Sequence, residues 1–418
     1  KNFYRPLTDE EKRKLVENML NGGLSQLDPY SAYLNERDLG LFESHNQGEF
    51  DGVGILMDDS PKNKYLTVRS PMPGGPAYEA GIQPGDVILK VARTSTEGMT
   101  IEKARELITG KSGTQVKLLV RKGAGTLEPE EVVLTRAKIA MPVVEGYNRD
   151  PANPAAWDYF PDKEHQIALV RLTGFTEKTS KPLKAVLDQI DRDGAKALVF
   201  DLRDNPGGIL HEAVEVGDLF LASGTIVSTQ DRIGGGRSWA AKDDKSVWER
   251  PKDRPIAVLI DHLSASASEI VAAALQDNHR AVLVGERTFG KGSVQKLFDL
   301  SDKKSALKLT FEVWLTPNGK KIHRPPDGKE IDDWGVFPSP GFDVKLSDDD
   351  WKKYVAFKRG LDTIEGKPGV APPPKGQPAK AAGPAEGYKD PALEKALEHL
   401  RKELKGTSSL RPRRQLAS

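Results

Sequence analysis

The feature that most constrains the fold is a regular alternation of short apolar runs and amphipathic stretches between residues 165 and 285. The apolar runs are "IALVRL", "ALVFDLR", "IAVLI" and "AVLVG", and a stretch with helical periodicity follows each of the first three. Near-continuous apolar strands, each followed by a helix, are typical of a parallel or mixed sheet that helices cover on both faces. We therefore predict an α/β core flanked by helices in this part of the chain.

Changes of residue pattern divide the chain into further parts. Residues 1–47 are predicted to form a helical N-terminal segment. Residues 48–138 contain five short β-type runs and two short helices, broken by Gly and Pro, which predicts a small independently folded module. The α/β core is assigned to residues 139–346 and begins with a Pro- and Asn-rich connector or insertion, 141–164. A second segment, 228–248, is predicted to be a surface loop or hairpin.

The C-terminal extension, residues 347–418, has a different composition. Its linker, 367–387, is rich in Pro, Ala and Gly and is predicted to be disordered. Leucines at helical spacing predict a terminal helix over residues 391–405. This helix is expected to dock on the body, to mediate self-association into a homo-oligomer, or to remain a solvated tail.

Composition excludes several classes of protein. The 418 residues contain no Cys, which excludes disulfides, cysteine nucleophiles and thiolate metal sites. The formal net charge of +1 argues against nucleic acid as a partner. No apolar stretch approaches the roughly 20 residues that a membrane-spanning helix needs. Because the first residue is Lys1 rather than Met, an upstream signal or membrane anchor is expected.

Three serines alternate with alanines at the start of a helical stretch, "SASASEIVAAAL" (264–275). Ser266 and Glu269 form an S-x-x-E pattern, which predicts a helix N-terminus at this serine. The alternative is that one hydroxyl is a nucleophile beside the free N–H groups of the first helical turn. The capping pattern by itself does not decide between them.

Two Gly-containing segments accompany the serines. In "GERTFGKGSVQK", Lys291 lies between two glycines; the segment also matches a phosphate-binding loop, but Gly292 occupies the position where Ser or Thr would bind magnesium. In "FDLRDNPGGIL" (200–210), a predicted buried strand ends in a turn whose glycines allow the close backbone approach that an oxyanion hole requires. The alternative for this segment is a plain strand-to-helix turn.

These segments resemble those of the C-terminal processing proteases, also called tail-specific proteases, which are serine peptidases with a Ser-Lys dyad. In this family a serine of "SASASE" precedes the lysine of "FGKG" by 25 residues, and Ser266 and Lys291 have this spacing. The resemblance implies that Ser266 is the nucleophile and Lys291 the general base. In some members a Gln four residues after the lysine completes a triad, and Gln295 matches it.

The resemblance also implies an oxyanion hole. "DLRDNPGG" corresponds to the family's "LRxNxGG" segment, in which one glycine N–H acts together with the N–H that follows the nucleophile. The implied donors are Ala267 and either Gly207 or Gly208.

The choice of Ser266 as the nucleophile assigns its neighbours to other tasks. Ser264 is then expected to cap the helix, Ser268 to be a packing residue and Glu269 to be a structural residue near the site. A lysine that acts as a base must be neutral, and its ordinary pKa of about 10.4 must be lowered by burial or by neighbouring dipoles. A Ser-His-Asp mechanism is the alternative, with three candidate histidines: His211, His262 and His279.

The small module resembles a PDZ domain of the permuted bacterial type. The evidence is "GEFDGVGILM" followed by "SPMPGGPAYEAGIQPGDVILKV". The resemblance implies that a loop offers backbone N–H groups to the carboxylate of a protein C-terminus, and that the peptide adds as a strand. The residues of this loop are Gly52, Val53, Gly54 and Ile55. "LDPYSAYL" (27–34) and "WLTPNGKKIH" (314–323) also resemble family segments, "LDPHSxYL" and "YxTPxGxxI".

The predicted function is therefore a serine endopeptidase that needs no cofactor and no metal. The expected partners are unfolded or C-terminally tagged proteins, and the family resemblance implies an extracytoplasmic location in the periplasm or cell envelope. A catalytically silent or latent scaffold that binds protein C-termini is the alternative.

Overall fold

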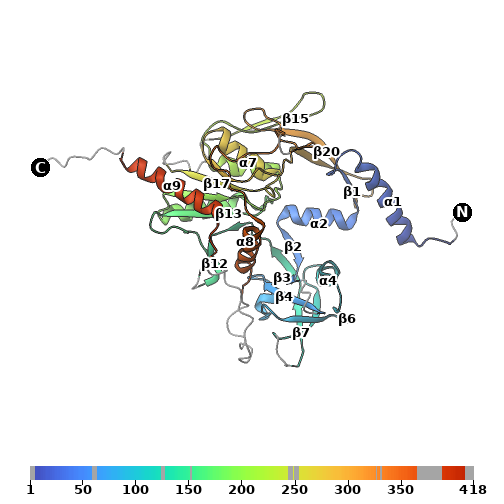
Figure 1. The fold of residues 1–418 in the computed structure, drawn as a ribbon. Coiled ribbons are helices and arrows are strands. Elements are labelled where there is room, and N and C mark those ends of the chain that lie inside the picture. The colour runs from blue at the N-terminus through green and yellow to red at the C-terminus, as the bar shows by residue number, and fades with distance from the viewer. Residues whose placement is uncertain are drawn as a thin grey trace. The chain divides into compact units, whose positions relative to one another are not determined.

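The structure is a computed structural model of the chain (Figure 1). It describes residues 5–58, 64–123, 128–150, 153–242, 248, 254–325, 327–329, 332–364 and 388–409. The chain divides into two compact units. Unit 1 is built from residues 1–47, 164–344 and 395–418, and unit 2 from residues 48–163 and 345–394.

Parallel strands lie at the centre of unit 1. They pair in the order β13 (Ile167–Leu172), β14 (Ala197–Asp201), β17 (Ile256–Ile260) and β18 (Val282–Gly285). Every residue of the first three strands is buried, which explains their almost continuously apolar sequences. The helices between successive strands are α5 (Ser180–Arg192), α6 (Leu210–Asp218) and α7 (Ala267–Asp277). The predicted α/β core is confirmed.

A second, antiparallel sheet belongs to the same unit. Its strands are β1 (Ala32–Leu34), β15 (Thr225–Gln230), β16 (Ser238–Ala240), β19 (Ser293–Asp299) and β20 (Ala306–Leu315). Strand β20 pairs with β19, β1 and β15, and β15 forms a hairpin with β16. The prediction that the N-terminal segment is helical is wrong for β1. This strand exists because Tyr33 pairs with Leu307 of β20, a partner far away in the sequence.

Helices lie on both sides of β1 in the sequence. They are α1 (Asp9–Leu24), which Thr8 caps through a hydrogen bond from the Glu11 N–H, and α2 (Glu36–Gln47). No residue of α1 is buried.

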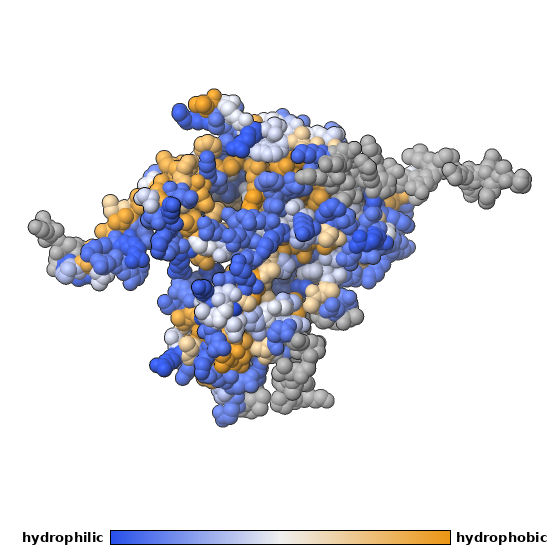
Figure 2. Space-filling model, turned by 180° about the vertical axis from the view of Figure 1, so that it is seen from behind, coloured by the Kyte–Doolittle hydropathy of each residue, from blue (hydrophilic) through white to orange (hydrophobic). Residues whose placement is uncertain are grey.

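In the face that Figure 2 shows, hydrophilic residues predominate and hydrophobic residues form separate patches between them.

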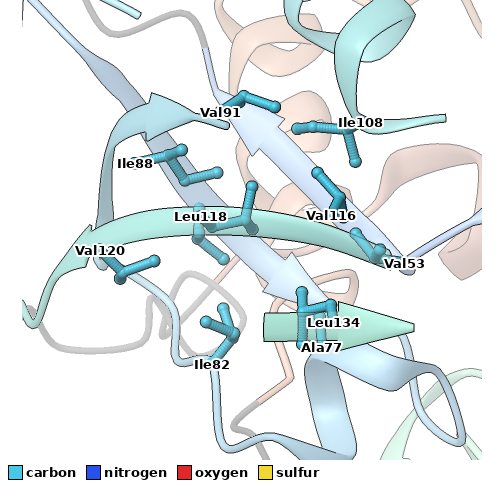
Figure 3. Packing of buried hydrophobic residues seen from close by; sticks show 11 residues of the cluster. Val53, Ala77, Ile82, Ile88, Val91, Ile108, Val116, Leu118, Val120 and Leu134 are labelled. Carbon is cyan, nitrogen blue, oxygen red and sulfur yellow. The ribbon is translucent and has the colours of Figure 1, made fainter. Parts of the chain in front are cut away.

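Unit 2 contains an antiparallel sheet in the order β3-β4-β5-β7-β8, with β6 paired to β5. Its strands are β3 (Ile55–Asp58), β4 (Leu66–Pro71), β5 (Val87–Val91), β6 (Thr94–Ser95), β7 (Gln115–Arg121) and β8 (Glu130–Thr135). The helices are α3 (Pro76–Glu79) and α4 (Ile101–Ile108), and β2 (Glu49–Gly52) pairs with β9 (Ala137–Ala140). Alternate residues of the strands, such as Val116, Leu118 and Val120, point into a common core (Figure 3).

The connector and the described parts of the C-terminal extension contain regular secondary structure. The connector contains β10 (Val144–Glu145) and a hairpin of β11 (Asn148–Asp150) and β12 (Asn153–Asp158). The extension contains α8 (Asp348–Leu361) in unit 2, where the Ile364 N–H donates to Ser70 Oγ at 2.9 Å. The linker 367–387 lies outside the described residues.

The terminal helix is α9 (Pro391–Ser409). Leu397 and Leu400 are buried, and the His399 ring lies 4.9 Å from the Phe342 ring of unit 1. The structure therefore shows a docked helix rather than a solvated tail. Among the helices of the described ranges, none is long and apolar enough to cross a membrane.

Candidate active site

The three sequence segments with predicted chemistry follow adjacent strands of the parallel sheet. The glycine turn follows β14, the serine turn follows β17, and the lysine loop follows β18. Because these strands are parallel neighbours, their carboxyl ends lie at one edge of the sheet, the usual place for a ligand site in α/β folds.

Ser266 occupies a strained turn at the start of α7. It is the N-cap residue of this helix, with φ 56° and ψ −115°. A positive φ is unfavourable for a residue with a side chain and is common at functional sites. The next N–H, that of Ala267, has no hydrogen-bond acceptor among the described residues. The turn thus brings a serine hydroxyl and a free N–H donor together.

The prediction that Ser264 caps α7 is wrong. Ser264 Oγ donates to the Leu202 carbonyl at 2.8 Å and accepts from the Asp261 N–H at 3.0 Å. These bonds tie the serine turn to the end of β14, so Ser264 stabilises the approach to the helix instead of its first turn. Ser268 Oγ donates to the Asn205 carbonyl at 2.9 Å and makes a second link to the glycine turn.

Glu269 is fully buried and joins the serine turn to the lysine loop. Its Oε2 accepts from the N–H groups of Ser266 and Lys291, both at 2.8 Å. Its Oε1 accepts from the Gly290 N–H at 2.7 Å and from Thr288 Oγ1 at 2.5 Å. Burial raises the pKa of Glu269 to about 7, although these donors act in the opposite direction. One carboxyl group therefore holds the backbones of both segments.

The glycine turn packs directly against Ser266. A Cβ on Gly207 would lie 2.8 Å from Ser266 Cβ and 2.5 Å from the Ala265 carbonyl oxygen, so only glycine fits. The Gly207 N–H donates to Asn205 Oδ1 at 2.9 Å. The Gly208 N–H has no acceptor among the described residues. Of the two glycines, Gly208 is therefore the one with a free N–H donor.

Lys291 is partly buried, and its ammonium group lies over an aromatic ring. Nζ is 4.7 Å from the centroid of the Tyr30 ring. Burial lowers the pKa of Lys291, the charge of Lys308 lowers it further, and the charge of Glu269 opposes both. In the described part of the chain, no hydrogen bond joins Lys291 Nζ to Ser266 Oγ. Glu269 holds the two backbones together, while the two side chains share no hydrogen bond among the described residues.

Gln295 lies on β19, the strand that follows the lysine loop. Its side-chain amide donates to Ser293 Oγ at 3.0 Å and to Thr310 Oγ1 at 3.2 Å. Within the described residues it makes no hydrogen bond to Lys291. The structure thus places Gln295 in a hydroxyl network beside the predicted dyad.

The N-terminal segment contributes to the same network. Asp28 Oδ1 accepts from Thr310 Oγ1 at 3.0 Å and from the Tyr30 N–H at 2.8 Å, and the Thr310 N–H donates to Ser31 Oγ at 3.1 Å. These bonds fix the segment to β20 and place Tyr30 beside Lys291.

The candidate histidines have other neighbours. His211 Nδ1 lies 3.9 Å from Glu215, and His262 Nδ1 lies 3.7 Å from Glu286. In the described ranges, neither of these histidines hydrogen-bonds to Ser266, and His279 does not do so either. The geometry therefore does not favour a Ser-His-Asp mechanism. The same ranges contain no group of three or more His, Asp or Glu side chains arranged to hold a metal ion.

The predicted carboxylate-binding loop of unit 2 follows β2 and leads into β3. Gly54 has φ 72°, and the carbonyls of Val53 and Gly54 accept from the N–H groups of Ala77 and Met72. The N–H groups of Val53 and Gly54 have no acceptor among the described residues. Because β3 is the last strand of its sheet, no described strand pairs with its outer edge. Ile55, at the start of β3, packs against the core of unit 2.

Three residues of the site were not identified as site residues from the sequence. Asn205 accepts from Gly207 through its side chain and from the Ala265 N–H, at 3.0 Å, through its carbonyl. Tyr30 faces Lys291, and Asp28 anchors Tyr30. Their only sequence signal is their position in "DLRDNPGG" and "LDPYSAYL", which resemble family segments.

Each unit of the chain matches the model of a known protein family. Residues 166–332 match the model of Peptidase family S41, and residues 67–122 match that of a PDZ domain. The chain is 36% identical over 322 residues to a carboxyl-terminal-processing protease of Synechocystis sp., covering 77% of this chain and 70% of that protein. It is 34% identical over 344 residues to the carboxy-terminal processing protease CtpA of Bacillus subtilis, covering 81% and 68%.

Among solved structures, the chain matches that of a photosystem II D1 C-terminal processing protease. It is 28% identical in sequence with a TM-score of 0.44, and the match covers 82% of this chain and 84% of that chain.

Proposed function

This chain belongs to the carboxyl-terminal processing proteases of peptidase family S41 and contains a PDZ domain, and from this premise we propose that it cleaves peptide bonds through a Ser266–Lys291 acyl-enzyme mechanism. The observation that carries the proposal is the carboxylate of Glu269. It fixes the backbone of the serine turn and that of the lysine loop at once, which is the arrangement that a dyad on two separate segments requires.

The chemistry begins with a neutral Lys291. Nζ takes the proton from Ser266 Oγ, and Oγ forms a bond to the substrate carbonyl carbon. The protonated lysine then returns this proton to the leaving amine as the C–N bond breaks. A water molecule, deprotonated by the same amine, hydrolyses the acyl-enzyme and restores the serine. Burial supports this role because it lowers the pKa of Lys291.

The negative oxygen of each tetrahedral intermediate needs donors. The free N–H groups of Gly208 and Ala267 flank the nucleophile and supply them. Gly207 serves the same site sterically, since its lack of a side chain allows the glycine turn to pack against Ser266.

Substrate selection is assigned to unit 2. A protein C-terminus places its carboxylate at the N–H groups of the loop Gly52–Ile55 and extends along the unpaired edge of β3. Substrates are therefore proteins with an accessible, unstructured C-terminal segment. Gln295 is proposed to orient the Lys291 amine once this amine has moved toward Ser266.

The absence of a Ser266–Lys291 hydrogen bond among the described residues favours one alternative, a silent or latent scaffold that binds C-termini without cleavage. Cleavage of an unfolded protein distinguishes the two functions. Wild type is expected to cleave it, whereas S266A and K291A are expected to be inactive. The matched controls S238A and K296A change exposed residues of β16 and β19 and are expected to retain cleavage.

Labelling of Ser266 by a fluorophosphonate, with and without a C-terminal peptide, separates latency from silence. A latent enzyme reacts only when the peptide is present. Intact substrate and no labelling under either condition, with the peptide still bound, would contradict the proposed protease activity and favour the scaffold.

A further inference from the structure

Tyr30 makes a direct contact with the predicted base. The Lys291 ammonium lies 4.7 Å from the centroid of its ring. The ring belongs to the segment "LDPYSAYL", where Tyr30 stands in place of the histidine of the resembling family pattern. Asp28 holds the Tyr30 backbone through the 2.8 Å bond from its N–H, and Thr310 in turn donates to Asp28. The aromatic ring is thus in a fixed position beside Lys291.

The ring distinguishes the two protonation states of the lysine. The face of an aromatic ring attracts an ammonium group through its quadrupole, but it offers a neutral amine no comparable attraction. A protonated Lys291 is therefore held over Tyr30, where it has no hydrogen bond to Ser266 Oγ. A neutral amine is released from the ring and can accept a hydrogen bond from the serine hydroxyl.

We propose that Tyr30 is a positioning residue for Lys291, which holds the protonated side chain in a resting place without a hydrogen bond to Ser266 and releases it when the proton is lost. This inference rests on the proposed function of Lys291 as the base. It goes beyond that function because it gives one aromatic side chain control over where the Lys291 amine lies: over the ring when it is protonated, and free to reach Ser266 when it is neutral.

Other charged and titratable groups face the same amine. Lys308 lowers the pKa of Lys291 and Glu269 raises it. His323 packs edge-on to Tyr30 at 6.3 Å, and burial lowers its pKa, with the charge of Lys291 acting in the same direction. The pKa of Tyr30 itself is raised by burial and by the charges of Glu269 and Asp28, which favours its neutral hydroxyl. Tyr30→Leu removes the hydroxyl and the contact with His323 as well as the ring face, so Tyr30→Phe, which keeps the ring, is needed beside it.

The test is the pH dependence of kcat/KM for Tyr30→Leu, measured on the full chain with an unfolded protein substrate. Loss of the ring removes an interaction that favours the charged amine, so the acidic limb should move to lower pH by roughly 0.4 to 1.5 units. Tyr33→Leu is the matched control, because Tyr33 lies on β1 three residues away and, among the described residues, makes no cation–π contact or hydrogen bond with the Lys291 side chain. Its acidic limb should coincide with that of wild type.

A second readout does not need activity. In protein with 13C-labelled lysines, the Lys291 signal is identified by its loss in Lys291→Met, and its titration gives the pKa directly. Tyr30→Leu should lower this pKa, whereas Tyr30→Phe keeps the ring face and should restore it. Thermal unfolding checks that each variant folds, and Tyr30→Met replaces Tyr30→Leu if the latter does not.

The outcomes separate the two proposals. An unchanged Lys291 titration in Tyr30→Leu, or an equal shift in Tyr30→Phe, overturns the positioning role whatever the activity. A wild-type protein that never cleaves, but whose Lys291 pKa falls in Tyr30→Leu, contradicts the protease mechanism and supports the contact between the ring and the lysine.

Discussion

Each unit of this protein has a turn that offers free backbone N–H groups. The two turns differ in the residue that adopts a positive φ. In the catalytic turn of unit 1 that position is Ser266, with φ 56°, whereas in the carboxylate loop of unit 2 it is Gly54, with φ 72°. A left-handed conformation costs a residue with a side chain about 1–2 kcal/mol, and costs glycine almost nothing. Strain is thus present at the position whose side chain is proposed to act, and absent at the position where only the backbone is proposed to act.

The two turns also differ in how closely they are packed. A Cβ on Gly207 would lie 2.5 Å from the Ala265 carbonyl and 2.8 Å from the Ala267 nitrogen, both in the catalytic turn. A Cβ on Gly54 would lie no closer than 3.4 Å to any neighbour, which is ordinary contact. We therefore expect the catalytic turn to tolerate no added atom and the carboxylate loop to tolerate one at a moderate cost.

Substitution of Ser266 gives the largest expected effect. Ser266→Ala and Ser266→Gly both remove the nucleophile and should lower kcat/KM by roughly 10⁴-fold or more. They should differ in stability, because glycine relieves the strain and alanine keeps it. Ser266→Gly should be more stable than Ser266→Ala by about 1 kcal/mol in urea unfolding. Equal stabilities would show that the turn is not strained, and the comparison with Gly54 would fail.

Gly207→Ala tests the close packing of the catalytic turn. The added Cβ collides with the backbone on both sides of Ser266 and must displace it. A displaced nucleophile and oxyanion donor should lower kcat by roughly 10²- to 10³-fold, as the loss of one oxyanion donor does. Fluorophosphonate labelling rates measure this effect at Ser266 itself. Wild-type labelling in Gly207→Ala would contradict the predicted packing.

Glu269 is expected to make the free energy of unfolding of this protein depend on pH. Its folded pKa of about 7 lies above the ordinary value of 4.5, so the folded protein binds more protons than the unfolded chain between these values. The stability that it contributes is thus complete below pH 4.5 and falls as the pH rises through 7. The expected loss is about 3 kcal/mol relative to Glu269→Gln, whose side chain does not titrate.

Urea unfolding of wild type and Glu269→Gln between pH 4.5 and 7.5 measures this difference. Glu43→Gln, at an exposed position of α2, is the control. A constant difference between wild type and Glu269→Gln across this range would argue against the raised pKa.

Gly54→Ala tests the looser turn and has the smallest expected effect. The free loop of the variant is expected to leave the left-handed conformation, and the cost of about 1 kcal/mol to regain it should weaken the binding of a C-terminal peptide roughly fivefold, as measured by calorimetry. Gly98→Ala is the matched control, since Gly98 has φ 66° in the same unit and a Cβ there would meet no atom within 4 Å. If both variants weakened binding equally, the effect would come from general strain and not from the carboxylate loop.

Local patterns were sufficient to predict much of this molecule. The apolar runs of β13, β14, β17 and β18 and the helices between them follow from periodicity that each segment carries alone. The spacing of Ser266 and Lys291 in a resembling family pattern selected them as candidates, and the structure brings both to the ends of adjacent strands. Strand β1 was missed because it contains only three residues and depends on pairing with β20.

By itself, the sequence determined the residue types at the turns, the order of strands and helices in the α/β core, and the family of the chain. Only the tertiary structure decided what each side chain contacts: that Ser264 bonds to β14, that Glu269 joins two loops, and that Tyr30 lies under Lys291. The physical reason is that periodicity and turn preference are local properties, whereas burial, cation–π contacts and shared carboxylates depend on segments that come together only when the chain folds.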